Sequence, residues 1–167
     1  SGGGVFIACH TFAGTLGRIT ADGGGGGTAD GGGGGGGRIA VVYDPVAQVS
    51  VSPAPTLRLS AAPGSGLYGG APGTVYLADN TFYPYTTLQD SAYIVISNLT
   101  SWSPASLTIT NAWIRFQDGL QLGVTNGVVI HGGNGRIELR HLAVLTCGTL
   151  LMTNSARMYV YSGPTSV

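Results

Sequence analysis

The sequence predicts an all-β protein built mainly as a right-handed parallel β-helix (a β-solenoid), joined to extended glycine-rich segments of the polyglycine II type. Two observations carry this prediction. Short strand-like pieces recur in the last third with a longer period of about 22 residues. In the first third, runs of glycine alternate with β-branched segments. An antiparallel β-sandwich or jelly roll is the alternative, because short strands with frequent turns are typical of that class too.

Composition narrows the class of function. The chain has 167 residues, of which 30 are glycine and only 8% are charged. Seven acids balance seven bases, all of them arginine, so the net charge is zero. A nucleic acid is therefore not expected as the partner, because phosphate binding needs clustered Lys and Arg. The sequence has no run of about 18 apolar residues, so a membrane-spanning helix is not predicted. Because the chain opens at Ser1, we expect a mature or excised piece of a longer polypeptide.

Three glycine runs mark the first third: Gly2–Gly4, Gly23–Gly27 and Gly31–Gly37. Without Cβ atoms, neighbouring backbones can approach closely enough to form hydrogen bonds between extended strands. We expect the runs to be ordered and to lie side by side, with Thr28-Ala29-Asp30 as a turn that Asp30 caps. A disordered loop extruded from the solenoid is the competing interpretation.

Strand-like segments separate and follow these runs. Those in the first two thirds are rich in β-branched residues or alternate apolar with polar residues, and most are bounded by Gly or Pro. They cover residues 5–8, 17–20, 38–43, 49–52, 57–60, 74–77 and 92–96.

The final third carries the clearest repeat, with three short strands in each coil. The expected strands are 107–109, 113–116, 120–122, 128–130, 136–139, 142–145, 150–152 and 158–161. The period stacks three sets of apolar residues: Leu107, Val128 and Leu150; Ile114, Ile137 and Met158; Leu120 and Leu142. We place a glycine-rich β block at 1–80 and solenoid coils at 81–167, continuous with it as one structural unit.

The order of motifs between Gly2 and Asn80 resembles a known family. The residues concerned are Gly14-Thr15, Ile19-Thr20-Ala21-Asp22-Gly23, Gly35-Gly36-Gly37-Arg38-Ile39-Ala40 and Gly73-Thr74-Val75-Tyr76-Leu77. They resemble the glycine-rich repeat region of very large secreted or surface β-helix-type proteins of environmental bacteria. The resemblance implies a structural role outside the cell or on its surface, and it brings no catalytic residue.

Charged residues in the periodic section suggest one binding surface. Arg115, Arg136 and Arg157 are spaced like the coils, which would stack them as a ladder with Glu138 nearby. Such a ladder could bind an anionic sugar. The alternative is an outward face whose charges meet solvent or a partner.

Metal and thiol chemistry have few candidates. Asp22 and Asp30 precede glycine runs, so they could supply oxygen ligands for calcium or could cap turns. No other metal or cofactor is expected. Cys9 and Cys147 could form a disulfide within or between subunits, or remain buried thiols.

Aromatic residues gather towards the middle of the chain, where they could form a sugar-binding platform or pack in the core and in subunit contacts: Phe82, Tyr83, Tyr85, Tyr93, Trp102 and Trp113.

Three functions are compatible with these observations. The first is an extracellular or cell-surface structural protein, a glycine-rich β-solenoid unit of a fibre that self-assembles through strand edges. Its partners would be itself or neighbouring repeats. The second is an adhesin or carbohydrate-binding module for surface glycans. The third is a β-helical polysaccharide lyase or hydrolase. We favour the first, in which the chain is not an enzyme.

Overall fold

The computed structural model describes residues 1–27, 31–81 and 87–161. All the strand pairings given below are parallel, and the strands stack coil upon coil as a β-solenoid. The β-helix prediction is therefore confirmed, and the antiparallel sandwich is wrong. The chain divides into two compact units, one with residues 1–81 and 90–97 and the other with residues 87–89 and 98–161.

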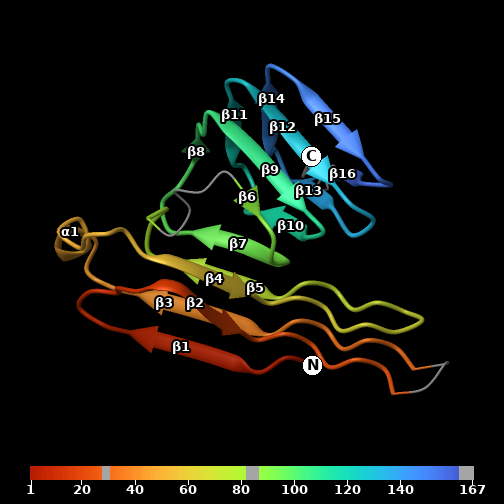
Figure 1. The fold of residues 1–167 in the computed structure, drawn as a ribbon, viewed down its shortest axis with the longest axis horizontal. Coiled ribbons are helices and arrows are strands. Elements are labelled where there is room, and N and C mark those ends of the chain that lie inside the picture. Colours follow the sequence, from red (N-terminus) through yellow and green to blue (C-terminus); the bar gives the residue numbers. More distant parts are fainter. Residues whose placement is uncertain (28–30, 82–86, 162–167) are drawn as a thin grey trace, which may run out of the picture. The chain divides into compact units, whose positions relative to one another are not determined.

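The first unit contains one four-stranded parallel arrangement and one strand pair (Figure 1). The four strands are β1 (Gly4–Ala8), β3 (Arg38–Val42), β5 (Thr74–Leu77) and β7 (Ala92–Ile96). The pair is β2 (Thr15–Thr20) with β4 (Thr56–Ser60), and one short helix, α1 (Pro45–Gln48), follows β3. Alternate side chains of each strand face inward.

Inward-facing side chains of this unit stack in two columns across the four strands. Ladder pairing places the members directly opposite one another: Val5, Ile39, Val75 and Ile94 in one column, and Ile7, Val41, Leu77 and Ile96 in the other. The members on β3, β5 and β7 are at most 5% exposed. Burial of each such side chain stabilises the fold by about 1.5–3 kcal/mol.

The glycine runs form an ordered bundle beside these strands, visible in Figure 1 as long stretches that continue from the strand ends. The peptide groups of the run 31–37 bond to several neighbouring stretches, and Gly64 and Leu67 donate to the carbonyl groups of Gly34 and Gly31. The N–H groups of Gly33 and Gly36 donate to the carbonyl oxygens of Tyr68 and Ala71, and those of Gly34 and Gly37 donate to the carbonyl oxygens of Gly24 and Ala21. The carbonyl oxygen of Gly35 accepts from the N–H of Gly2. Partners repeat every three residues along the run, as in a helix of the polyproline II type.

Close backbone approach explains why the bundle needs glycine. A Cβ added at Gly36 would lie 2.0 Å from the carbonyl oxygen of Ala61, and one added at Gly33 would lie 2.0 Å from that of Gly64. A Cβ at Gly24 would meet nothing within 4 Å. The prediction that Gly23–Gly27 and Gly31–Gly37 are ordered and extended is therefore confirmed. The turn assigned to Thr28-Ala29-Asp30 lies outside the described residues.

Polar side chains also link successive coils of the first unit. Asp90, whose side chain is 10% exposed, accepts from Arg58 Nε at 2.6 Å and from Arg18 Nη2 at 3.1 Å. Because Arg18 and Arg58 are ladder partners on β2 and β4, Asp90 neutralises two cations that would otherwise face each other.

The strand expected at 49–52 is wrong, because the chain forms α1 just before it. Asp44 caps this helix by accepting from the backbone N–H of Val46 at 2.9 Å and of Ala47 at 3.3 Å, and Pro45 stands at its first position. Val49 then ends the helix with its side chain 86% exposed.

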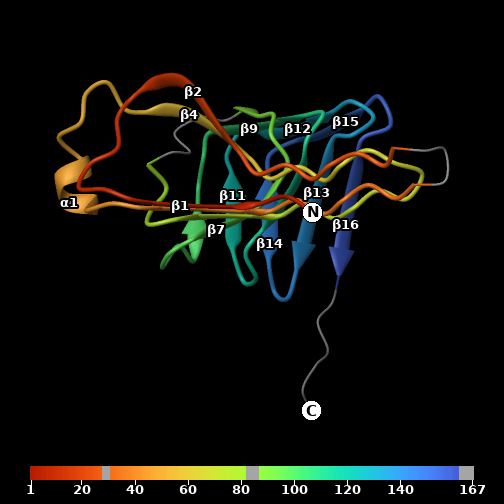
Figure 2. The ribbon, with the colours of Figure 1, turned by 90° about the horizontal axis from the view of Figure 1, so that it is seen from below.

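The second unit is a three-sided solenoid, in which each side is a parallel sheet (Figure 2). One side contains β6 (Thr87–Leu88), β9 (Ser106–Thr110), β12 (Gly127–His131) and β15 (Leu150–Thr153). The second contains β10 (Trp113–Phe116), β13 (Arg136–Arg140) and β16 (Arg157–Tyr161). The third contains β8 (Ser101–Trp102), β11 (Gln121–Val124) and β14 (Val144–Cys147).

The predicted apolar columns of this unit are confirmed on two sides. Val128 pairs with Leu107 in the preceding coil and with Leu150 in the next. Ile137 likewise pairs with Ile114 and Met158. On the third side the expected pair of Leu120 with Leu142 is wrong.

The third side follows a different register because a turn intervenes. Leu122 pairs with Leu145, one strand position further along than expected. His141 and Leu142 have φ angles of 43° and 66°, and Leu142 is 88% exposed. Leu142, predicted as the first residue of a strand at 142–145, therefore belongs with His141 to the turn before β14.

Candidate functional site

The charged residues predicted as a ladder lie on the outward face of β10, β13 and β16, but in a different register. Arg136 is directly opposite Arg157, as expected. Arg115 is opposite Glu138, and Trp113 takes the position opposite Arg136. The ladder of three arginines is therefore wrong, because the step from β10 to β13 is two residues longer than that from β13 to β16.

Glu138 occupies the centre of this face and is only 2% exposed, although it points away from the apolar core. Its carboxylate forms an ion pair with Arg140 on the same strand and lies 3.9 Å from Nε of Arg115. Trp113 Nε1 donates to its second oxygen at 3.1 Å. Two guanidinium groups and an indole N–H thus compensate the buried charge, as a buried carboxylate requires.

Aromatic rings extend the cluster on both sides of Glu138. The guanidinium carbon of Arg136 lies 4.9 Å from the ring centre of Trp113, and that of Arg140 lies 4.7 Å from that of Tyr161. Cation–π contacts of this length stabilise by about 0.5–1 kcal/mol at exposed sites. The rings of Tyr159 and Tyr161 stack at 6.2 Å with an interplanar angle of 18°.

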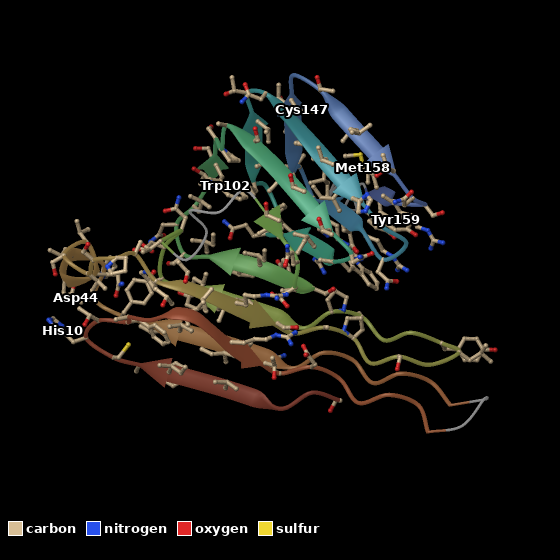
Figure 3. The ribbon with its side chains drawn as sticks, viewed as in Figure 1. His10, Asp44, Trp102, Cys147, Met158 and Tyr159 are labelled. Atoms are coloured by element: carbon tan, nitrogen blue, oxygen red, sulfur yellow. The ribbon has the colours of Figure 1, made fainter. Side chains whose placement is uncertain are left out.

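Figure 3 labels Tyr159 and Met158, neighbours on β16 that belong to opposite faces. Met158 continues the buried column of Ile137, whereas Tyr159 pairs with Glu138 on the outward face. Sequence reasoning missed Trp113, Arg140, Tyr159 and Tyr161 as members of this cluster. Strict alternation along 136–140 and 157–161 would have identified the residues on β13 and β16, but the register of Trp113 depends on the intervening turn.

Asp22 acts as a cap between neighbouring segments. Its carboxylate accepts from Ser60 Oγ at 2.5 Å and from the backbone N–H of Ala62 at 2.7 Å. Arg18 Nη2 lies 3.9 Å from its other oxygen. The described ranges contain no group of three or more His, Cys, Asp or Glu side chains that could hold a metal ion, and Asp30, the other calcium candidate, lies outside them. Asp22 therefore links the segment that follows β2 to the end of β4 and the segment that follows it, and these bonds are not those of a cap on its own turn.

Both cysteines are free thiols, so the disulfide proposed within the chain is not formed. Cys9 follows β1, and its thiol lies 3.9 Å from the carbonyl oxygen of Val42. Cys147, labelled in Figure 3, ends β14 directly opposite the buried Val124. Its thiol is a small side chain on an inward-facing position of the outermost coil.

The aromatic residues near the middle of the chain do not form one platform within the described residues. Trp102 packs edge-to-face against Phe116 with ring centres 5.9 Å apart, which is a contact of the core type. Tyr93 lies on β7 of the first unit, and Trp113 belongs to the arginine face. The remaining members of the predicted group, Phe82, Tyr83 and Tyr85, lie outside the described residues.

A second unusual surface is the outer coil of the second unit, made of β14, β15 and β16. Its inward-facing apolar residues are far more exposed than those that they pair with. Leu150 is 41% exposed, Met152 is 38% exposed and Val160 is 72% exposed, whereas the residues opposite them are 5% exposed or less. In the described part of the chain, no further strand pairs with the outer edges of these three strands. The sequence pattern predicted strands at 150–152 and 158–161, where β15 and β16 lie, but its strand at 142–145 begins two residues before β14.

No family model, curated protein or solved structure matches this chain. The family resemblance of the glycine-rich block therefore stays a prediction. No helix among the described residues has the length and apolar character needed to cross a membrane. Functional assignment consequently depends on the geometry of the chain itself.

Proposed function

We propose that this chain is an extracellular structural protein, a glycine-rich β-solenoid unit of a surface fibre or filament that self-assembles through strand edges. The role proposed is not catalytic. The observation that carries the proposal is the outer coil β14–β16, in which the core-facing Leu150, Met152 and Val160 are exposed. A second copy that added its strands in parallel would cover these side chains and satisfy the free backbone groups at the same time.

The first unit offers a second strand edge of similar character. In the described chain β1 pairs on one side only, with β3. Its core-facing Val5 and Ile7 are only half-buried, in contrast to Ile39 and Val41 opposite them, which are each 1% exposed. Addition of the outer coil of one copy to the β1 edge of another would be heterologous, and heterologous contacts that do not close produce filaments.

Charge does not oppose this association. The net charge is zero and only 8% of the residues are charged, so copies would not repel one another strongly. Edge strands of soluble proteins are commonly protected by lysine or proline. Strands β14, β15 and β16 contain neither residue, and their one formal charge is Arg157.

Negative-stain electron microscopy and fibre diffraction of the purified chain test the proposal. We expect unbranched fibres with a strong reflection at about 4.8 Å along the fibre axis, the spacing between strands that lie across it. Particles of single-chain size at every concentration would contradict the proposed assembly. Antibody labelling of intact producing cells tests the proposed location separately.

A further inference from the structure

The outward face of β10, β13 and β16 concentrates positive charge in a chain whose net charge is zero. It contains Arg115, Arg136, Arg140 and Arg157, four of the seven arginines. Among the described residues, the acids that pair with them are Glu138, which pairs with Arg115 and Arg140, and Asp118, 3.6 Å from Arg115. The cluster therefore carries a formal excess of two positive charges.

Arg136 and Arg157 account for this excess. They are ladder partners on adjacent strands, and within residues 1–27, 31–81 and 87–161 neither forms an ion pair with a carboxylate. Like charges directly opposite each other on neighbouring strands are destabilising. In the first unit the similar pair of Arg18 and Arg58 is bridged by Asp90. The pair on β13 and β16 has the same arrangement without the bridging acid, so a carboxylate from another molecule could fill the same role.

Flat rings accompany these arginines. Trp113 lies under Arg136, and the stacked Tyr159 and Tyr161 follow Arg157 along β16. Tyr161 is 47% exposed and Arg157 is exposed, so both are open to a ligand. Aromatic rings of this kind present an apolar surface with a polar tip, which suits the face of a sugar ring. Guanidinium groups suit carboxylates, because their donors match the two oxygens.

We propose that the outward face of β10, β13 and β16 binds an acidic polysaccharide, a chain of pyranose rings that carry carboxylates. Arg136 and Arg157 bind the carboxylates, while Tyr159 and Tyr161 contact the sugar rings. Glu138 is a positioning residue, because it fixes the guanidinium groups of Arg115 and Arg140 beside the ligand. Single-stranded nucleic acid is disfavoured, because half of the guanidinium groups on this face already have acidic partners. The inference does not depend on fibre formation.

Titration calorimetry of the full chain with polygalacturonate tests the proposal, with dextran, polyglutamate and single-stranded DNA as comparison polymers. We expect binding to polygalacturonate that weakens as salt is added, and weaker or undetectable binding to the other three. Arg157→Gln should weaken the affinity about tenfold, as the loss of one charge-assisted hydrogen bond predicts. Tyr159→Ala should weaken it about threefold or more, whereas Tyr159→Phe should retain it.

Arg38→Gln is the matched control, because Arg38 is an exposed arginine at the start of β3 in the first unit. It should bind polygalacturonate like the wild type, and all variants should be folded at the temperature of the binding measurement. Equal binding of dextran or polyglutamate, stronger binding of DNA, or equal losses in Arg38→Gln and Arg157→Gln would each overturn the proposal. Absence of binding to polygalacturonate at low salt would overturn it as well.

Discussion

Leu150 lies directly opposite Val128 in the solenoid ladder, yet 41% of Leu150 is exposed whereas only 1% of Val128 is. The two residues occupy equivalent positions in successive coils. Their difference in exposure arises because Val128 lies between two coils, with Leu107 on one side and Leu150 on the other. Leu150 has a described coil on one side only, the coil that contains Val128. This contrast provides a matched pair for separating folding from assembly.

Val128→Asp should destabilise the fold severely, by about 3–5 kcal/mol, because it places an unpaired charge inside the apolar column. Leu150→Asp should change the free energy of unfolding of the isolated chain much less, by about 1 kcal/mol, because water can reach the new carboxylate. Urea denaturation measures both values. Equal losses for the two variants would show that Leu150 is not at an open end.

Gly36→Ala should destabilise the glycine bundle by about 1–3 kcal/mol, the usual range for overpacking, because the added Cβ would lie 2.0 Å from the carbonyl oxygen of Ala61. Gly24→Ala is the control, since its Cβ would meet nothing within 4 Å. That variant should change stability by less than about 1 kcal/mol. Thermal denaturation of the two proteins side by side checks the difference, and indistinguishable melting temperatures would argue against a packed bundle.

Glu138→Gln should destabilise the second unit by about 3 kcal/mol, because it removes the charge that compensates the guanidinium groups of Arg115 and Arg140. Asp118→Asn removes an acid that is 44% exposed and also pairs with Arg115. Ion pairs at such exposed positions contribute about 0–1 kcal/mol, so this control should be nearly neutral. Comparable losses in the two variants would contradict a central role for Glu138.

Tyr43 should make the fold sensitive to alkali. Burial raises the pKa of the Tyr43 phenol well above its ordinary value, and the neighbouring Asp79 carboxylate, which accepts its hydrogen bond, raises that pKa further. The folded-state pKa therefore exceeds the unfolded value of about 10. This contribution to stability is complete below pH 10 and is lost as the pH rises through the folded-state pKa.

Denaturation measured between pH 8 and pH 12 should thus show a smaller alkaline loss of stability in Tyr43→Phe than in the wild type. At pH 8 the same variant should be less stable by about 1 kcal/mol, the net contribution of one hydrogen bond. Asp79→Asn should reduce the alkaline loss in part, because burial remains. Identical pH profiles for all three proteins would refute the effect.

The repeating parts of the fold could be predicted from the sequence because every coil must satisfy the same structural requirement. Inward positions such as Ile114 and Ile137 must be apolar in every coil, and their spacing reveals the pitch of the solenoid. The glycine bundle was predictable for a similar reason, because a long run without side chains orders only where backbones can bond to each other. Segments whose structure depends on single local contacts, such as α1 and its Asp44 cap, were missed.

The candidate site was predicted only in part, because its geometry depends on turn lengths. The step between ladder partners is 23 positions from Arg115 to Glu138 but 21 from Arg136 to Arg157. A constant period therefore placed Arg115 beside Arg136, two residues away from its true partner. The residue types identified Glu138 as a member of the cluster. They did not predict that Glu138 is buried beneath guanidinium groups.

Sedimentation velocity of the full chain over a range of concentrations tests the central claim, end-to-end assembly through the outer coil, most directly. Wild-type protein should grow into large species as the concentration rises, whereas Leu150→Asp should remain a folded monomer. Thr146→Asp is the matched control, because Thr146 is an exposed residue of the same coil on the outward face of β14, opposite Gly123. It should assemble like the wild type. A wild-type chain that sediments as a monomer at every concentration, or an assembly that Leu150→Asp leaves intact, would contradict the account.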